Sequence, residues 1–216
     1  GTSRVGYRVW QVYWAHVGLF FATLALTVVL TNSSLGTRNY WGQLNLWPIF
    51  VESDKWTNPD ILLSFMTLRY VPNYFDILPM YMVVLILMSV VMWLSRHSLW
   101  FVAAFVGLVW LMAQDALMQS LNLGAYHLEF PAEPWSDRQW FFNPFGWQLI
   151  FFTGFAFMRG WLPKPPVTTT LLAVAAVLVI VNVPFSNIGV REFGLDWARA
   201  WRIDHKAWID KSDFGV

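Results

Sequence analysis

Residues 140–152 combine the features of a helix start with a polar side chain, Gln148, that can bind a ligand. Asn143 stands directly before Pro144, the order typical of an N-cap followed by the first helical position. Gln148 comes about one turn later, in a largely apolar run. Because an unpartnered amide in hydrocarbon costs free energy, Gln148 must hydrogen-bond to another helix or line a cavity, and both interpretations stay open.

A second segment, residues 74–81, begins in the same way. Asp76 is expected to cap a helix, Pro79 falls in its first turn, and Tyr81 follows on the same element. A helix N-terminus carries roughly half a positive charge and free N–H donors. Two such starts at one face can bind a carboxylate or stabilise an oxyanion, and simple capping at two interfaces is the alternative. We expect Asp76 and Gln148 to approach one cavity.

Two further features place polar groups at membrane depth. Asp115, Gln119 and Asn122 stand at i, i+4 and i+7, so they share one stripe of a helix. This stripe is either a helix end that is exposed to water or part of a substrate pocket. His16 is an ionisable residue well inside another apolar run, where it is either functional or a neutral side chain that bridges two helices.

Proton transfer near neutral pH requires a group such as histidine, and the chain has four: His16, His97, His127 and His205. For His127, in a polar segment, catalysis, exposure and a packing hydrogen bond are equally compatible with the sequence. The chain has no cysteine and shows no phosphate-binding loop, dinucleotide fingerprint or zinc spacing. The sequence therefore predicts neither a metal site nor a bound cofactor.

The composition predicts an integral membrane protein. Of the 216 residues, 57% are hydrophobic and only 12% are charged, whereas an average soluble domain has roughly 25% charged residues. The net charge of +1 gives no basic surface for nucleic acid. We therefore expect the lipid bilayer, and no nucleic acid, as a partner.

The predicted fold is all-α, a polytopic transmembrane bundle that forms one domain over residues 1–216. A span needs about 20 mostly apolar residues, and the apolar runs do not alternate as barrel strands would. The five predicted spans are residues 9–30, 77–94, 99–121, 144–158 and 168–183. The run Ile61–Leu68 is too short to span, and we expect an interfacial helix there, capped by Asn58.

Charge placement predicts the orientation of the bundle. The segments before the first span, between the second and third, and between the fourth and fifth carry no acid, and their basic residues are Arg4, Arg8, Arg96, Arg159 and Lys164. Short segments rich in Arg and Lys face the cytoplasm. The N-terminus is thus predicted to be cytoplasmic, and the long polar segments with all 13 acidic residues periplasmic.

Four motifs in this sequence resemble the OpgC family, which is related to the acyltransferase-3 superfamily. They are Asp76–Tyr81 (DILPMY), Asn143–Gln148 (NPFGWQ), the approach Arg8–His16 and the pair Asp210–Lys211. The resemblance implies a multi-pass protein of the bacterial inner membrane. It also implies transfer of a succinyl-type acyl group from acyl-CoA to a periplasmic glucan or other glycan, with Asp76, Tyr81, Asn143 and Gln148 lining the pocket.

The sequence also departs from this family. Family members begin with further spans that contain an Asp-His pair, the expected acid and base, and they continue beyond the Asp-Lys motif. The resemblance therefore implies that the catalytic base lies outside this segment, and that residues 1–216 are an internal part of a longer chain without activity alone. A non-catalytic subunit in a larger membrane complex is the alternative function. A transporter ranks third, because no inverted repeat is visible.

The predicted topology can be tested with single cysteines, because the chain has none of its own. We expect cysteines at Asp54 and Glu133 to react with an impermeant maleimide in intact cells, since both acids lie on the predicted periplasmic side. Cysteines at Arg96 and Lys164 should react only after the membrane is opened. Labelling at Arg96 in intact cells would show that the orientation is wrong.

Overall fold

The computed structural model describes residues 2–33, 38–51, 57–206 and 212–213. Within these ranges the regular structure is helical, and the extended pairing is limited to one isolated bridge between Pro131 and Gln139. The prediction of an all-α fold is confirmed. Asp54, one of the residues used to predict the topology, lies outside the described residues.

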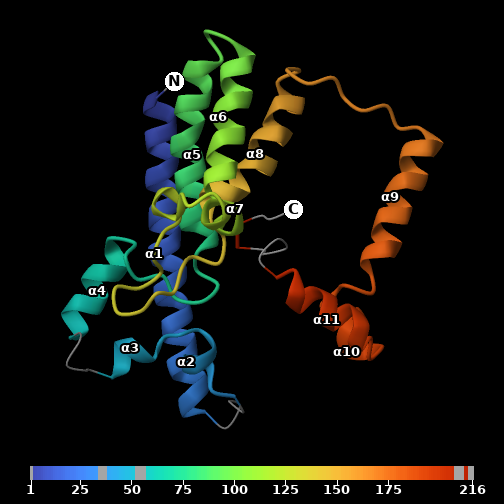
Figure 1. Cartoon of the computed structure of the whole chain (residues 1–216). Coiled ribbons are helices and arrows are strands. Elements are labelled where there is room, and N and C mark those ends of the chain that lie inside the picture. Colours follow the sequence, from blue (N-terminus) through green and yellow to red (C-terminus); the bar gives the residue numbers. More distant parts are fainter. Residues whose placement is uncertain (1, 34–37, 52–56, 207–211, 214–216) are drawn as a thin grey trace.

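Four long helices pack side by side to form the central bundle (Figure 1). They are α1 (Thr2–Asn32), α5 (Ile77–Leu94), α6 (Leu99–Met112) and α8 (Pro144–Met158). Their contacts are apolar, and the buried residues shared by α5, α6 and α8 are Val84, Val91, Val102, Val106 and Phe152. Burying these side chains fixes the positions of the polar segments at the helix ends.

The connections in Figure 1 lie in two groups at opposite ends of α5, α6 and α8. The turn between α5 and α6 and the chain that follows α8 lie at the same end as the N-terminus. These are the segments that carry basic residues without acids. The starts of α5 and α8 lie at the opposite end, where the acidic connections gather.

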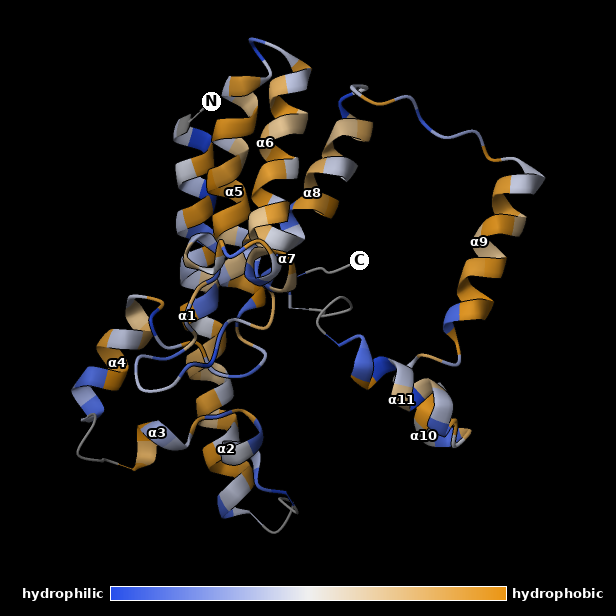
Figure 2. Ribbon diagram, viewed as in Figure 1, coloured by the Kyte–Doolittle hydropathy of each residue, from blue (hydrophilic) through white to orange (hydrophobic). Residues whose placement is uncertain are grey.

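Two helices, α1 and α5, are long and apolar enough to cross a membrane. α6, α8 and α9 (Thr169–Asn182) are apolar but shorter, with 14, 15 and 14 residues. Figure 2 colours α5, α6, α8 and α9 mostly hydrophobic, and many large apolar side chains of the five helices are exposed. Such broad apolar surfaces are rare on soluble monomers, and a bilayer would cover them.

The third predicted span is not one helix, so the expectation of a continuous helix over 99–121 is wrong. α6 ends at Met112, and α7 (Asp115–Ser120) begins after Gln114, whose backbone is extended. Asn122 has a φ of 56° and lies beyond α7. The stripe is therefore reduced to Asp115 and Gln119, which are joined by a 3.3 Å hydrogen bond from Gln119 Nε2 to Asp115 Oδ1.

The short apolar run forms α4 (Asn58–Met66), but its cap differs from the prediction. Asn58 is already helical, and Thr57 is the N-cap. Asp60 accepts hydrogen bonds from the backbone N–H and the hydroxyl of Thr57, which lower the pKa of its carboxyl group. Phe65 of α4 stacks on Phe20 of α1 with ring centroids 3.8 Å apart, so α4 packs against the bundle.

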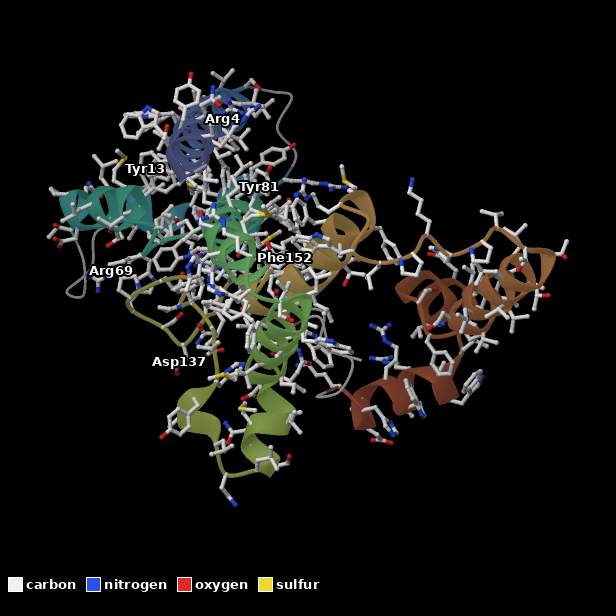
Figure 3. All side chains as sticks on the ribbon, turned by 90° about the horizontal axis from the view of Figure 1, so that it is seen from above. Arg4, Tyr13, Arg69, Tyr81, Asp137 and Phe152 are labelled. Carbon is white, nitrogen blue, oxygen red and sulfur yellow. The ribbon has the colours of Figure 1, made fainter. Side chains whose placement is uncertain are left out.

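The remaining helices lie around or away from the bundle. α2 (Tyr40–Gln43) and α3 (Trp47–Phe50) follow α1, and the 3-10 helix η1 (Gly124–Tyr126) follows α7. α9, α10 (Asn187–Glu192) and α11 (Asp196–Asp204) stand apart from the four central helices in both views (Figures 1 and 3). Every side chain of α9 is exposed, so no other part of the described structure buries this helix.

His16 of α1 is buried among aromatic rings rather than in a polar site. Its ring stacks on Phe65 at 5.0 Å and meets Phe75 edge-on at 6.4 Å. Neither ring nitrogen has a hydrogen-bond partner among the described residues. A neutral histidine that bridges two helices through ring packing therefore fits this position.

We predict that His16→Phe leaves the protein as stable as wild type or raises its melting temperature in detergent. The substitution keeps an aromatic ring against Phe65 and removes nitrogens whose burial costs about 1–3 kcal/mol when they are unpartnered. Phe65→Ala is the control and should destabilise by about 3–5 kcal/mol through the cavity it leaves. A clear loss of stability in His16→Phe would reveal a partner for the imidazole.

Candidate functional site

Asn143 caps α8 as its sequence predicted and also joins two other segments. Its side-chain oxygen accepts a hydrogen bond from the N–H of Phe145 at 3.1 Å, and Pro144 occupies the first helical turn. Its Nδ2 donates to the carbonyl of Leu128 at 2.8 Å and to Asp213 Oδ1 at 2.9 Å. A single buried amide thus satisfies a helix end, a loop and the C-terminal segment.

Asp76 does not cap α5, which corrects the expectation from sequence. Its backbone is in the right-handed helical region, with φ −79° and ψ −11°, whereas a capping residue needs an extended backbone to turn its side chain onto the helix start. Its Oδ2 instead accepts a 2.7 Å hydrogen bond from the N–H of Phe142. Asp76 therefore ties the start of α5 to the residue before the cap of α8.

Residues Ser212 and Asp213 lie against the start of α8. The backbone N–H of Asn143 donates to the carbonyl of Ser212 at 2.9 Å, and Gln114 Nε2 donates to the carbonyl of Asp213 at 2.8 Å. A Cβ atom on Gly146 would overlap the Asp213 carbonyl oxygen, so only glycine permits this approach. The Asp210–Lys211 motif itself lies outside the described residues.

A polar cavity of about 220 Å³ adjoins this junction and contains an acid-base cluster. The His127 side chain is only 8% exposed, and its Nε2 lies 3.0 Å from the carbonyl oxygen of Ala113. Its Nδ1 lies 3.4 Å from Glu129 Oε2 and 3.9 Å from Asp115 Oδ1. Asp213 Oδ2 lies 3.9 Å from Nε2, so three carboxylates surround one imidazole.

The pKa of Glu129 is raised, chiefly because burial disfavours its charged form. The negative charges of Asp213 and Asp115 raise it further, and His127 acts in the opposite direction. A buried carboxyl group with a raised pKa beside a histidine is a combination often found at functional sites. This cluster is the part of the described structure best suited to acid-base chemistry.

A larger cavity of about 520 Å³ shares Trp140 as a lining residue with the polar cavity. Its walls combine aromatic rings with a few polar groups, and the lining residues with those properties are Tyr74, Asp76, Arg138, Trp140, Phe141 and Phe142. Asp76 Oδ1 and Trp140 Nε1 are buried there without a hydrogen-bond partner among the described residues. A cavity with aromatic walls and a few polar groups has the composition of a small-molecule site.

Arg138 is fixed at this cavity by the loop that carries it. Its guanidinium donates to the carbonyl of Val71 at 2.6 Å and pairs with Glu133 at 3.2 Å. Glu133 also accepts a 2.9 Å hydrogen bond from Asn45. Behind this network Tyr70 is fully buried, and burial raises the pKa of its phenol.

The other predicted pocket residues lie elsewhere. Gln148 is fully buried and donates from Nε2 to the carbonyl of Val106 on α6 at 2.8 Å, and it is not among the residues that line the Asp76 cavity. Tyr81 is exposed on α5, with its ring 6.2 Å from that of Phe151 on α8. The structure thus brings Asp115 and Asn143 to one cavity and Asp76 to the other.

The profile of one known family, described as OpgC protein, matches residues 1–216. The chain belongs to the OpgC family. No curated protein and no solved structure matches the chain. Membership of the OpgC family indicates an acyltransferase-like protein associated with membranes, in agreement with the apolar helices α1 and α5.

Sequence reasoning left the role of His127 open and did not select Glu129, Arg138 or Asp213, which the structure brings to the two cavities. His127 and Glu129 are two residues apart, a spacing that by itself indicates no site. Long-range contacts bring Asp213 to the polar cavity and Arg138 to the larger cavity. A signal was nevertheless present, because acidic residues are rare in this chain and those near His127 stood out in an apolar sequence.

We predict that Gly146→Ala displaces the Ser212–Asp213 segment from α8. The added methyl group overlaps a backbone carbonyl that cannot move without breaking its hydrogen bond to Gln114, which should cost about 1–3 kcal/mol. Gly154→Ala on the same helix is the matched control, because nothing lies within 4 Å of the point that its Cβ would occupy. Equal melting temperatures and equal protease sensitivity near residue 206 for the two variants would contradict the prediction.

Proposed function

We propose that this OpgC-family protein is a membrane O-acyltransferase that transfers a succinyl-type acyl group to a periplasmic glucan or another glycan. The observation that carries the proposal is the larger cavity, which combines aromatic walls with Asp76 and Arg138. It lies at the predicted periplasmic end of α5 and α8, where a glycan has access. Family membership supplies the acyltransferase class.

The composition of this cavity supports a sugar as the acceptor. A sugar ring has an apolar face of C–H groups and a rim of hydroxyls, so it binds where an aromatic ring meets hydrogen-bonding side chains. Tyr74 is 77% exposed and lines the cavity, which leaves its ring free to cover a sugar face. Asp76 and Arg138 supply an acceptor and donors for hydroxyl groups.

The donor in this proposal is acyl-CoA from the cytoplasm, as the family resemblance implies. No bound cofactor or metal is part of it. In the proposed topology α1, α5, α6, α8 and α9 all cross the bacterial inner membrane, with the residues that flank the three shorter helices completing their spans. The thioester end of the acyl-CoA then has to reach the cavity from the cytoplasmic end of the bundle.

A non-catalytic subunit of a larger membrane complex is the second candidate function. The observation that favours it is α9, an apolar helix that stands apart from the bundle with every side chain exposed (Figures 1 and 3). A span of this kind can pack against partner proteins in the membrane. The two functions differ in whether the protein alone adds acyl groups to glycans.

The test is to express the complete reading frame that encodes residues 1–216 in cells that lack glucan acylation, and to measure ester-linked succinate on the glucans. We expect acylation to be restored. Tyr74→Ala should raise the acceptor KM about tenfold, because an aromatic contact is worth roughly 0.5–1.5 kcal/mol. Tyr126→Ala is the matched control, since Tyr126 is 64% exposed and does not line this cavity.

Absence of succinate in cells that contain folded wild-type protein would reject the acyltransferase and favour the non-catalytic subunit. Equal acceptor KM values for Tyr74→Ala and wild type would reject this cavity as the acceptor site. The enzyme class and the location of the acceptor are thus tested separately.

A further inference from the structure

We propose that His127, paired with Glu129, accepts the proton of the acceptor hydroxyl during acyl transfer. This inference rests on the proposed acyltransferase function and adds a catalytic group within residues 1–216. It differs from the expectation, drawn from the family resemblance, that the base lies outside this segment.

The contacts of His127 determine which ring nitrogen can take up a proton. Nε2 lies 3.0 Å from the Ala113 carbonyl, which can only accept a hydrogen bond, so Nε2 carries a hydrogen. Nδ1 is then the basic nitrogen, and it faces Glu129 at 3.4 Å and Asp115 at 3.9 Å. The lone pair of Nδ1 thus points toward the carboxyl groups of Glu129 and Asp115. A proton placed between Nδ1 and these groups would be attracted by both sides.

The charged groups that face the imidazole come from three separate elements. Asp115 belongs to α7, Glu129 to the loop after η1, and Asp213 to the C-terminal segment held by Asn143. All three are acids, and their carboxyl groups lie 3.4–3.9 Å from the ring nitrogens. The cluster therefore holds the ring in a fixed orientation, with Nδ1 toward Glu129 and Asp115.

The position of the cluster gives an acceptor access to it. Trp140 lines both the polar cavity and the larger aromatic cavity, so the two cavities meet at this residue. In this proposal, a glycan that binds against Tyr74 and Trp140 places one hydroxyl group in the polar cavity that His127 lines. The nearby carboxyl group of Glu129 also lines the polar cavity and can orient such a hydroxyl.

The proposed step balances with an acyl thioester as the donor. The hydroxyl oxygen attacks the thioester carbonyl carbon while its proton passes to His127 Nδ1, which forms the C–O bond and an imidazolium. Collapse of the tetrahedral intermediate then breaks the C–S bond. The imidazolium returns the proton to the departing thiolate, so the products are an ester and a thiol.

The experiment measures transfer of succinyl groups from succinyl-CoA to glucan by the complete protein in membranes, over a range of pH. We expect His127→Gln to lower kcat about 100-fold or more, the typical contribution of a general base. Glu129→Gln should move the acid limb of the kcat/KM profile to lower pH, because the imidazolium loses a neighbouring negative charge. His97→Gln, in the turn after α5, is the matched control and should act as wild type.

Three outcomes separate the hypotheses. Wild-type protein that transfers no acyl group would reject the proposed function and this inference together. Active wild type with His127→Gln within about threefold of its kcat would overturn only the proton acceptor. If His127→Gln does not fold, the Glu129→Gln pH profile decides, and an acid limb at the wild-type position overturns the inference.

Discussion

The hydrogen bonds of Asn143 hold together the end of the bundle where both cavities lie. This one side chain caps α8, binds the carbonyl of Leu128 and binds the carboxylate of Asp213. Polar backbone groups near hydrocarbon cannot rely on water, so each helix end there needs a protein partner. The same amide therefore satisfies the helix and fixes the two segments that supply the acid-base cluster.

Asp76 has a comparable function at the neighbouring helix. By accepting the N–H of Phe142 it sets the distance between the starts of α5 and α8, and Phe142 and Trp140 then form walls of the larger cavity. The apolar contacts among α5, α6 and α8 keep both starts at one level. The larger cavity thus depends on the packed bundle below it and on the polar side chains of Asp76 and Asn143 at the helix starts.

The two cavities divide the proposed chemistry. The larger one has aromatic walls and suits binding, whereas the smaller one contains His127 and three carboxylates and suits proton transfer. Trp140 lines both cavities, and the loop that carries it is held by Arg138 and Glu133. Acyl transfer needs both an acceptor site and a base, and the proposed reaction assigns one of these to each cavity.

The helical fold, the bounds of α5 and α8, the cap at Asn143 and the family could be predicted from sequence, because apolar runs and capping residues act locally. Long-range contacts fixed the rest. At the break between α6 and α7, Gln114 bonds to Asp213, 99 positions away, and Asp76 bonds to Phe142 instead of capping its own helix. Gln148 found a partner on α6. Such long-range hydrogen bonds leave no periodic pattern, so only the packed chain shows which polar residues share a site.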